Sequence, residues 1–60
     1  MIVRGKRLNK GDKVEFENDG EVIEGRYTRY FNPYILIETK EGLWRVLTPN
    51  VLSIEGEAVE

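Results

Sequence analysis

The segment DKVEFENDGEVIEG, residues 12–25, decides the fold class. Three charged side chains alternate here with Val14 and Phe16, which is the period of two expected for a half-buried β-strand. The NDG run at residues 18–20 consists of residue types that tolerate a positive φ, and such a run between two strand-like segments favours a tight turn. The segment therefore predicts a β-hairpin, whose second strand begins at Glu21.

The second strand continues into GRYTRYFNPY, residues 25–34, which holds all three tyrosines, one of the two phenylalanines and two arginines. Ile23, Gly25 and Tyr27 stand two residues apart, so they are expected on one face of the strand. A glycine in the middle of a strand indicates a bend or a close approach of another backbone. Pro33 ends the run, because proline fixes φ and cannot donate a ladder hydrogen bond.

Short apolar runs separated by turn residues continue after Pro33. Thr48 to Asn50 is predicted to form a single helical turn, with Thr48 as its cap and Pro49 in the first helical position. Two strands are expected before this turn and one after it, at Tyr34–Thr39, Leu43–Leu47 and Val51–Glu55. Five short strands, with one such turn before the last, are typical of a small closed barrel. The predicted fold is therefore an all-β, five-stranded small barrel with a short 3-10 turn before the last strand.

Sixty residues allow one domain, and a chain of this size has a thin stability margin. We expect the barrel over residues 11–55. Residues 1–10 are expected to form a basic N-terminal arm or a short strand, because the glycine inside this segment disfavours a helix. Residues 56–60 are expected to form an acidic tail that frays.

Charge is unevenly distributed along the chain, whose net charge is -2. Residues 1–13 contain five basic side chains and one acidic one, whereas residues 14–25 contain five acidic side chains and no basic one. An acidic chain is a poor non-specific ligand for nucleic acid, since that affinity comes mainly from phosphate neutralisation. An uneven chain can nevertheless place a basic patch on one face.

Several classes of chemistry lack the residues they need. The chain has no Cys and no His, so the usual thiolate nucleophile, general base and commonest transition-metal ligands are missing. There is also no glycine-rich phosphate loop. The first hairpin carries four glutamates, but their alternation predicts a solvent-facing surface rather than a catalytic pair. We therefore expect a protein that is not an enzyme and that holds no metal or cofactor.

The apolar runs are three or four residues long, too short for a transmembrane helix or a secretory signal. A cytoplasmic location without a membrane partner is expected. The chain lacks Gln and Cys and is rich in Glu, Lys, Ile and Val, which resembles the composition of thermophile proteins.

Three stretches resemble the SH3-like small barrels, in the broad sense that includes the Tudor, KOW and Sm-like folds. Lys10–Val14 resembles the opening of many such barrels. Asp19–Gly25 is similar to the Sm-like hairpin, in which a turn glycine and a bend glycine stand five residues apart. Thr48–Ile54 resembles the helical turn and closing strand of SH3-like domains, and its Asn-Val-Leu run resembles the second Sm motif. The resemblance covers about residues 10–55 and implies this barrel fold, and by analogy a nucleic-acid-associated role.

The aromatic run permits two interpretations. In one, its rings fill a small core. In the other, Tyr27 points inward while Arg26, Thr28 and Tyr30 point outward, and the interleaved rings and arginines suit stacked bases or a peptide. Trp44 is core or contact residue according to the phase of its strand: either Leu43, Arg45 and Leu47 share a face, or Trp44 and Val46 do.

These observations lead to a predicted non-catalytic binding module with RNA or another single-stranded nucleic acid as its partner. The alternative is a protein–protein interaction adaptor, or a small subunit of a larger or self-associating assembly. The basic N-terminal arm is either an auxiliary phosphate grip or merely a solvated end. The candidate binding residues are Arg26, Arg29, Tyr30, Tyr34, Trp44 and Arg45, with Arg4, Lys6 and Arg7 as the auxiliary basic residues.

Overall fold

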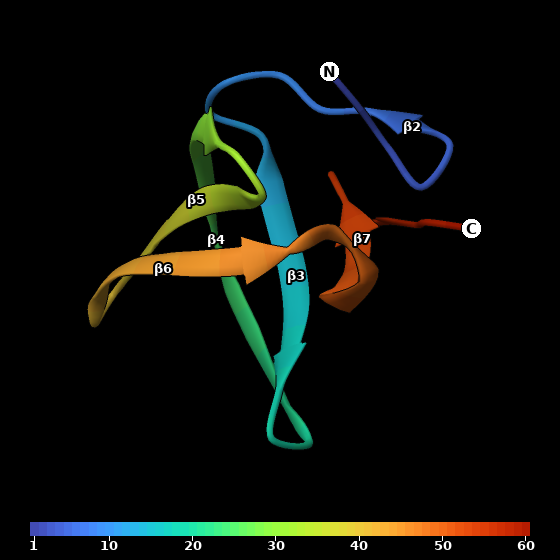
Figure 1. Cartoon of the computed structure of the whole chain (residues 1–60). Coiled ribbons are helices and arrows are strands. Elements are labelled where there is room, and N and C mark those ends of the chain that lie inside the picture. Colours follow the sequence, from blue (N-terminus) through green and yellow to red (C-terminus); the bar gives the residue numbers. More distant parts are fainter.

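The computed structural model describes residues 1–60 and is all-β, with eight strands and one 3-10 turn (Figure 1). Three of the strands, at the two ends of the chain, are only two residues long. The elements are β1 (Ile2–Val3), β2 (Lys6–Arg7), β3 (Lys13–Asn18), β4 (Glu21–Phe31), β5 (Tyr34–Thr39), β6 (Gly42–Leu47), η1 (Thr48–Asn50), β7 (Val51–Ile54) and β8 (Glu57–Ala58).

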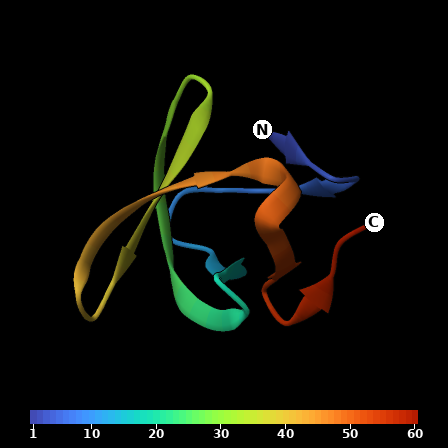
Figure 2. The same cartoon turned by 60° about the horizontal axis from the view of Figure 1, so that its bottom comes forward.

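The strands form two antiparallel sheets. β1 and β2 make a small hairpin of their own, and the other six strands make one sheet in the order β6-β5-β4-β3-β7-β8. The long strand β4 is the centre of this sheet, since it pairs with β3 along its first half and with β5 along its second half. Figure 2 shows the hairpin of β4 and β5 extending beyond the rest of the sheet.

The predicted five-stranded closed barrel is wrong in its strand number and in its closure. β6 and β7 are not hydrogen-bonded to each other, so the sheet stays open between them. The reason lies in the last hairpin: β7 pairs with β3 on one side and with β8 on the other, which leaves no free edge there for β6. The 3-10 turn before β7 has the predicted position, but Leu47 rather than Thr48 is its cap, and no side chain caps it.

Three of the hairpins share one turn geometry. Arg4-Gly5, Asp19-Gly20 and Glu55-Gly56 are two-residue connections, and both residues of each pair have a positive φ. This is the requirement of the type I′ turn, whose twist matches that of the strands it joins. Only the Asp-Gly turn was predicted, and the Arg-Gly and Glu-Gly turns account for the three additional short strands.

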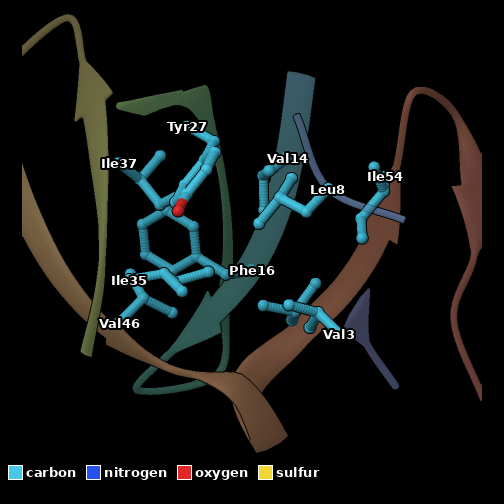
Figure 3. Close-up of a cluster of buried hydrophobic side chains, with 10 residues drawn as sticks. Val3, Leu8, Val14, Phe16, Tyr27, Ile35, Ile37, Val46 and Ile54 are labelled. Carbon is cyan, nitrogen blue, oxygen red and sulfur yellow. The ribbon is translucent and has the colours of Figure 1, made fainter. Parts of the chain in front are cut away.

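A single cluster of ten buried apolar side chains holds the molecule together (Figure 3). Phe16 is 1% exposed and packs against the half-buried Trp44, with the ring centroids 5.7 Å apart and the planes tilted by 57°. The cluster also contains Val3 and Leu8, each 1% exposed, so the N-terminal segment is part of the core. The other members are Val14, Tyr27, Ile35, Ile37, Val46, Val51 and Ile54.

Gly25 marks a close approach between strands, as its position in mid-strand indicates. A Cβ atom at this position would lie 2.5 Å from the backbone oxygen of Glu38 and 2.6 Å from a methyl group of Ile37. Neither neighbour is the end of a flexible side chain. Only glycine lets β4 and β5 pack this closely. Gly25 lies on the core face together with Ile23 and Tyr27, as predicted.

The C-terminal segment lies beside the turn of the β1–β2 hairpin (Figure 1). The amide of Glu60 donates to the carbonyl of Arg4 at 3.0 Å, and Lys6 forms an ion pair with Glu57 at 3.1 Å. Residues 1–10 were expected as an arm or a short strand, and they form the β1–β2 hairpin. The final residues were expected to fray, but Glu57–Ala58 pairs with β7 because the Glu55-Gly56 turn folds the chain back.

Candidate ligand-binding surface

The side of the β4–β5–β6 sheet that faces away from the core carries the candidate site, which we call the outer face. Residues directly paired across an antiparallel sheet lie on the same side of it. The pairing of β5 with both neighbours therefore defines three rows of side chains. These rows are Phe31–Tyr34–Leu47, Arg29–Leu36–Arg45 and Arg26–Glu38–Leu43.

A β-bulge at Thr28 determines which side chains reach the outer face. The register of β4 against β5 shifts between Tyr27 and Arg29, and the Thr28 hydroxyl donates to the carbonyl of Leu36 at 3.1 Å. An extra residue in one strand reverses the alternation of the residues that follow it. Arg29 and Phe31 are thereby moved to the outer face, although Tyr27 itself points into the core.

Two arginines of the outer face lie against aromatic rings. The guanidinium carbon of Arg29 is 5.5 Å from the centroid of Phe31, and that of Arg45 is 5.7 Å from the centroid of Tyr34. Both distances lie within the range of cation–π contact. Leu36 sits between the two arginines and is only 5% exposed, since their aliphatic stems cover apolar surface. These contacts form one patch of two rings, two guanidinium groups and a leucine.

Arg26 lies on the outer face but is engaged elsewhere. Its Nη1 donates to the carbonyl of Gly11 at 3.1 Å and is 3.9 Å from a carboxylate oxygen of Glu55. The side chain therefore turns toward the loop before β3, away from the other two arginines. Glu38, opposite it on β5, further lowers the positive charge of that row.

Tyr30 and Trp44 are not on the outer face. Tyr30 pairs with Ile35, whose side chain is core, and the expectation that it points outward with Arg26 fails because of the bulge. It remains 48% exposed, and its hydroxyl donates to Asn32 at 2.8 Å. Trp44 lies on the core side of β6 together with Val46, so Trp44 packs against the core rather than being part of the outer face.

The three auxiliary basic residues do not form a projecting arm. Arg4 donates from Nη1 to the carbonyls of Pro49 and Val51, which ties the β1–β2 hairpin to η1 and β7. Lys6 is paired with Glu57, and Arg7 is exposed. Lys6 and Arg7 border a shallow hollow of about 330 Å³ whose other lining residues are Gly5, Asp12, Ile54, Glu55 and Glu57. With three carboxylates in its lining, this hollow is poorly suited to an anionic ligand.

Sequence reasoning missed the apolar members of the outer face. Phe31 is 53% exposed, and Leu43 and Leu47 are 60% and 42% exposed. The signal for the two leucines was present in the alternation of β6. The direction of the Phe31 side chain could not be predicted, because the alternation of the sequence does not locate a bulge.

The same side of the sheet carries charge of opposite sign over β3 and β4. Glu15 is paired with Glu24 there, and the Ser53 hydroxyl donates to Glu15. Glu24 lies on β4 before the bulge and Arg29 lies on β4 after it, so the chain is dipolar in space as well as in sequence. In the core, burial raises the pKa of Tyr27 above its ordinary value near 10.

No protein-family model, curated protein or solved structure matches this chain. The structure also has no helix with the length and apolar character of a membrane span. It brings together no group of three or more His, Cys, Asp and Glu side chains that could hold a metal ion. The chemistry of the outer face is therefore the basis on which function can be inferred.

Proposed function

We propose that the chain is a non-catalytic binding module that holds single-stranded nucleic acid on its outer face. The observation that carries this proposal is the side-by-side placement of the Arg29–Phe31 and Arg45–Tyr34 pairs, on neighbouring strands of one surface. Aromatic planes take stacked bases, and adjacent arginines neutralise the phosphates between them. RNA is placed ahead of DNA because of the resemblance to SH3-like and Sm-like barrels, which is an argument from fold analogy.

The net charge of the chain is negative, but the charge on the outer face favours binding of nucleic acid. Arg29 and Arg45 have no carboxylate within ion-pair distance, so their charge is available to a ligand. The paired Glu15 and Glu24 lie on β3 and on the part of β4 that precedes the bulge, whereas Arg29 follows the bulge. Binding is expected to be weak and to have a shallow salt dependence, about 0.7 in the slope of log K against log salt for each phosphate neutralised, because few phosphates are contacted.

The test is a titration of the protein with a short oligouridine, followed by NMR at several salt concentrations. Arg45→Ala should weaken binding and lower the slope of log K against log salt by about 0.7, the value for one phosphate contact on a single strand. Lys10→Ala removes the same charge from an exposed position outside the outer face and should leave the slope unchanged. Equal effects of the two variants would contradict the proposal.

The second candidate function is a protein-interaction adaptor. It is favoured by the exposure of Leu43 and Leu47 on the outer face, since exposed apolar side chains gathered in one place mark interaction surfaces. An adaptor should bind almost independently of salt. Binding of a peptide that survives 0.5 M salt, together with no response to oligouridine, would favour this function over the first.

A further inference from the structure

β6 is the longest unpaired strand edge of the molecule. It pairs with β5 on one side and with no strand on the other, and it is six residues long. The opposite end of the sheet is β8, which has only two residues. The end of β4 beyond Tyr27 also lacks a partner on one side, but the bulge at Thr28 interrupts it, and bulges protect edges from pairing.

Three residues of β6 present backbone groups to this free edge. Successive residues of a strand direct their N–H and C=O groups to alternate sides. Because the Leu36 carbonyl accepts from Thr28 on β4, it is Ile35 and Ile37 that face β6, opposite Val46 and Trp44. The backbone groups that point away from the sheet are therefore those of Leu43, Arg45 and Leu47.

The edge carries few of the features that prevent strands from associating. Natural edges are protected by lysine, proline, bulges or inward-pointing charge. β6 contains none of these, and Arg45 is its one charged residue. Leu43 and Leu47 stand exposed beside it. We propose that β6 pairs antiparallel with β6 of a second copy of this chain.

The single charge of β6 selects the register of this pairing. A two-fold axis at Arg45 would place two arginines directly opposite each other, which is unfavourable. An axis at Val46 would place Leu43 opposite Pro49, which has no N–H to donate. An axis at Trp44 avoids both conflicts and puts Leu43 opposite Arg45 of the second copy. In this register the arginine stem covers the exposed leucine across the interface.

The closed dimer is favoured over an open-ended chain of copies because the other end of the sheet is occupied. β8 covers the edge of β7 at Ser53 and Ile54, so β6 of one copy cannot pair there with β7 of the next. Pairing β6 with β6 uses the same edge on both copies and is complete in two. A chain with thirteen buried residues also gains from the extra apolar burial.

Sedimentation equilibrium over a wide concentration range tests the dimer and its register. Leu43→Lys brings like charge opposite Arg45 of the second copy and should weaken dimerisation at low salt by about fivefold or more. Leu43→Glu brings opposite charge there and should strengthen it. Val22→Lys is the matched control, because Val22 is as exposed as Leu43 but lies on β4, away from this edge. Equal effects of the two lysine variants would overturn the proposal.

Amide hydrogen exchange identifies the strand that forms the interface, with no nucleic acid present. The Leu43 and Arg45 amides should gain protection as the concentration rises, while those of Trp44 and Val46 are protected throughout by β5. A dimer in which the Leu43 and Arg45 amides exchange freely would overturn the proposal, as would a monomer at every concentration. Protection that appears only after oligouridine is added would assign the edge to the nucleic acid. Since these measurements need no ligand, their outcome is separate from that of the proposed function.

Discussion

At the scale of single residues, Gly25 and Tyr27 constrain the fold most clearly. Both lie on the core face of β4, two residues apart. Gly25 must be small because the backbone of β5 approaches it closely. Tyr27 brings a hydroxyl into an apolar cluster, where this hydroxyl donates to the sulfur of Met1 at 3.4 Å.

Replacing Gly25 should separate β4 from β5. We expect Gly25→Ala to lower the free energy of unfolding by about 3 kcal/mol, because the new methyl group overlaps a backbone oxygen that cannot move aside. Gly11→Ala is the control, since its Cβ meets nothing within 4 Å and only the positive φ is strained. That variant should lose about 1 kcal/mol. Urea unfolding of both gives the comparison, and equal losses would refute the steric explanation.

Tyr27 should make the fold sensitive to alkaline pH. Its pKa is raised by burial in the folded state, so above about pH 10 the unfolded chain releases this proton first. Stability from this group is complete below pH 10 and falls as the pH rises further. Tyr27→Phe should therefore lose less stability between pH 9 and pH 11 than the unaltered protein, measured by urea unfolding. Tyr30→Phe, at an exposed position, should follow the unaltered protein.

At the scale of elements, the bulge in β4 divides this strand into two parts. The sequence predicts the side-chain directions correctly before the bulge and incorrectly after it. The alternation in β3 and the first half of β4 correctly predicted the β3–β4 hairpin and its core positions. After Thr28 the same alternation assigns Tyr30 to the wrong face. The two short terminal hairpins were missed for a related reason, because two-residue strands have no period and Arg-Gly and Glu-Gly are uncommon turn pairs.

The bulge provides a matched test of the outer face. Tyr34 lies on the outer face and Tyr30 on the other side of the same hairpin, so their removal should have different effects on ligand binding. We expect Tyr34→Ala to weaken oligouridine binding about tenfold, the effect of losing one stacked base. Tyr30→Ala should change it less than twofold, as measured by fluorescence anisotropy of a labelled oligonucleotide. The reverse order would place the site on the wrong side of the sheet.

At the scale of the whole molecule, the two ends of the chain complete the core. The alternation and the turn residues correctly predicted an all-β fold, but they did not indicate that residues 1–10 supply Val3 and Leu8 to the core. This segment contains four basic residues and one glycine, and its two buried apolar residues are separated by a turn. Only the assembled sheet reveals the open end of the core that they cover.

Shortening Leu8 should therefore affect the stability of the entire chain. Leu8→Ala is expected to lower the free energy of unfolding by about 3 kcal/mol, since a buried leucine leaves a cavity. For a domain of this size that is a large part of the total. Leu52→Ala, at a position that is 38% exposed, should lose less than about 1 kcal/mol. Thermal unfolding followed by circular dichroism compares the two, and a stable Leu8→Ala protein would mean that the β1–β2 hairpin is dispensable.

The hydrogen bond from the Glu60 amide to the Arg4 carbonyl fixes the last residue of the chain to the turn of the β1–β2 hairpin. In Figure 1 the C-terminal segment lies beside this turn, on the side of the molecule away from the turn between β5 and β6. A fusion partner attached after Glu60 would therefore emerge next to the β1–β2 hairpin and leave the turn between β5 and β6 uncovered.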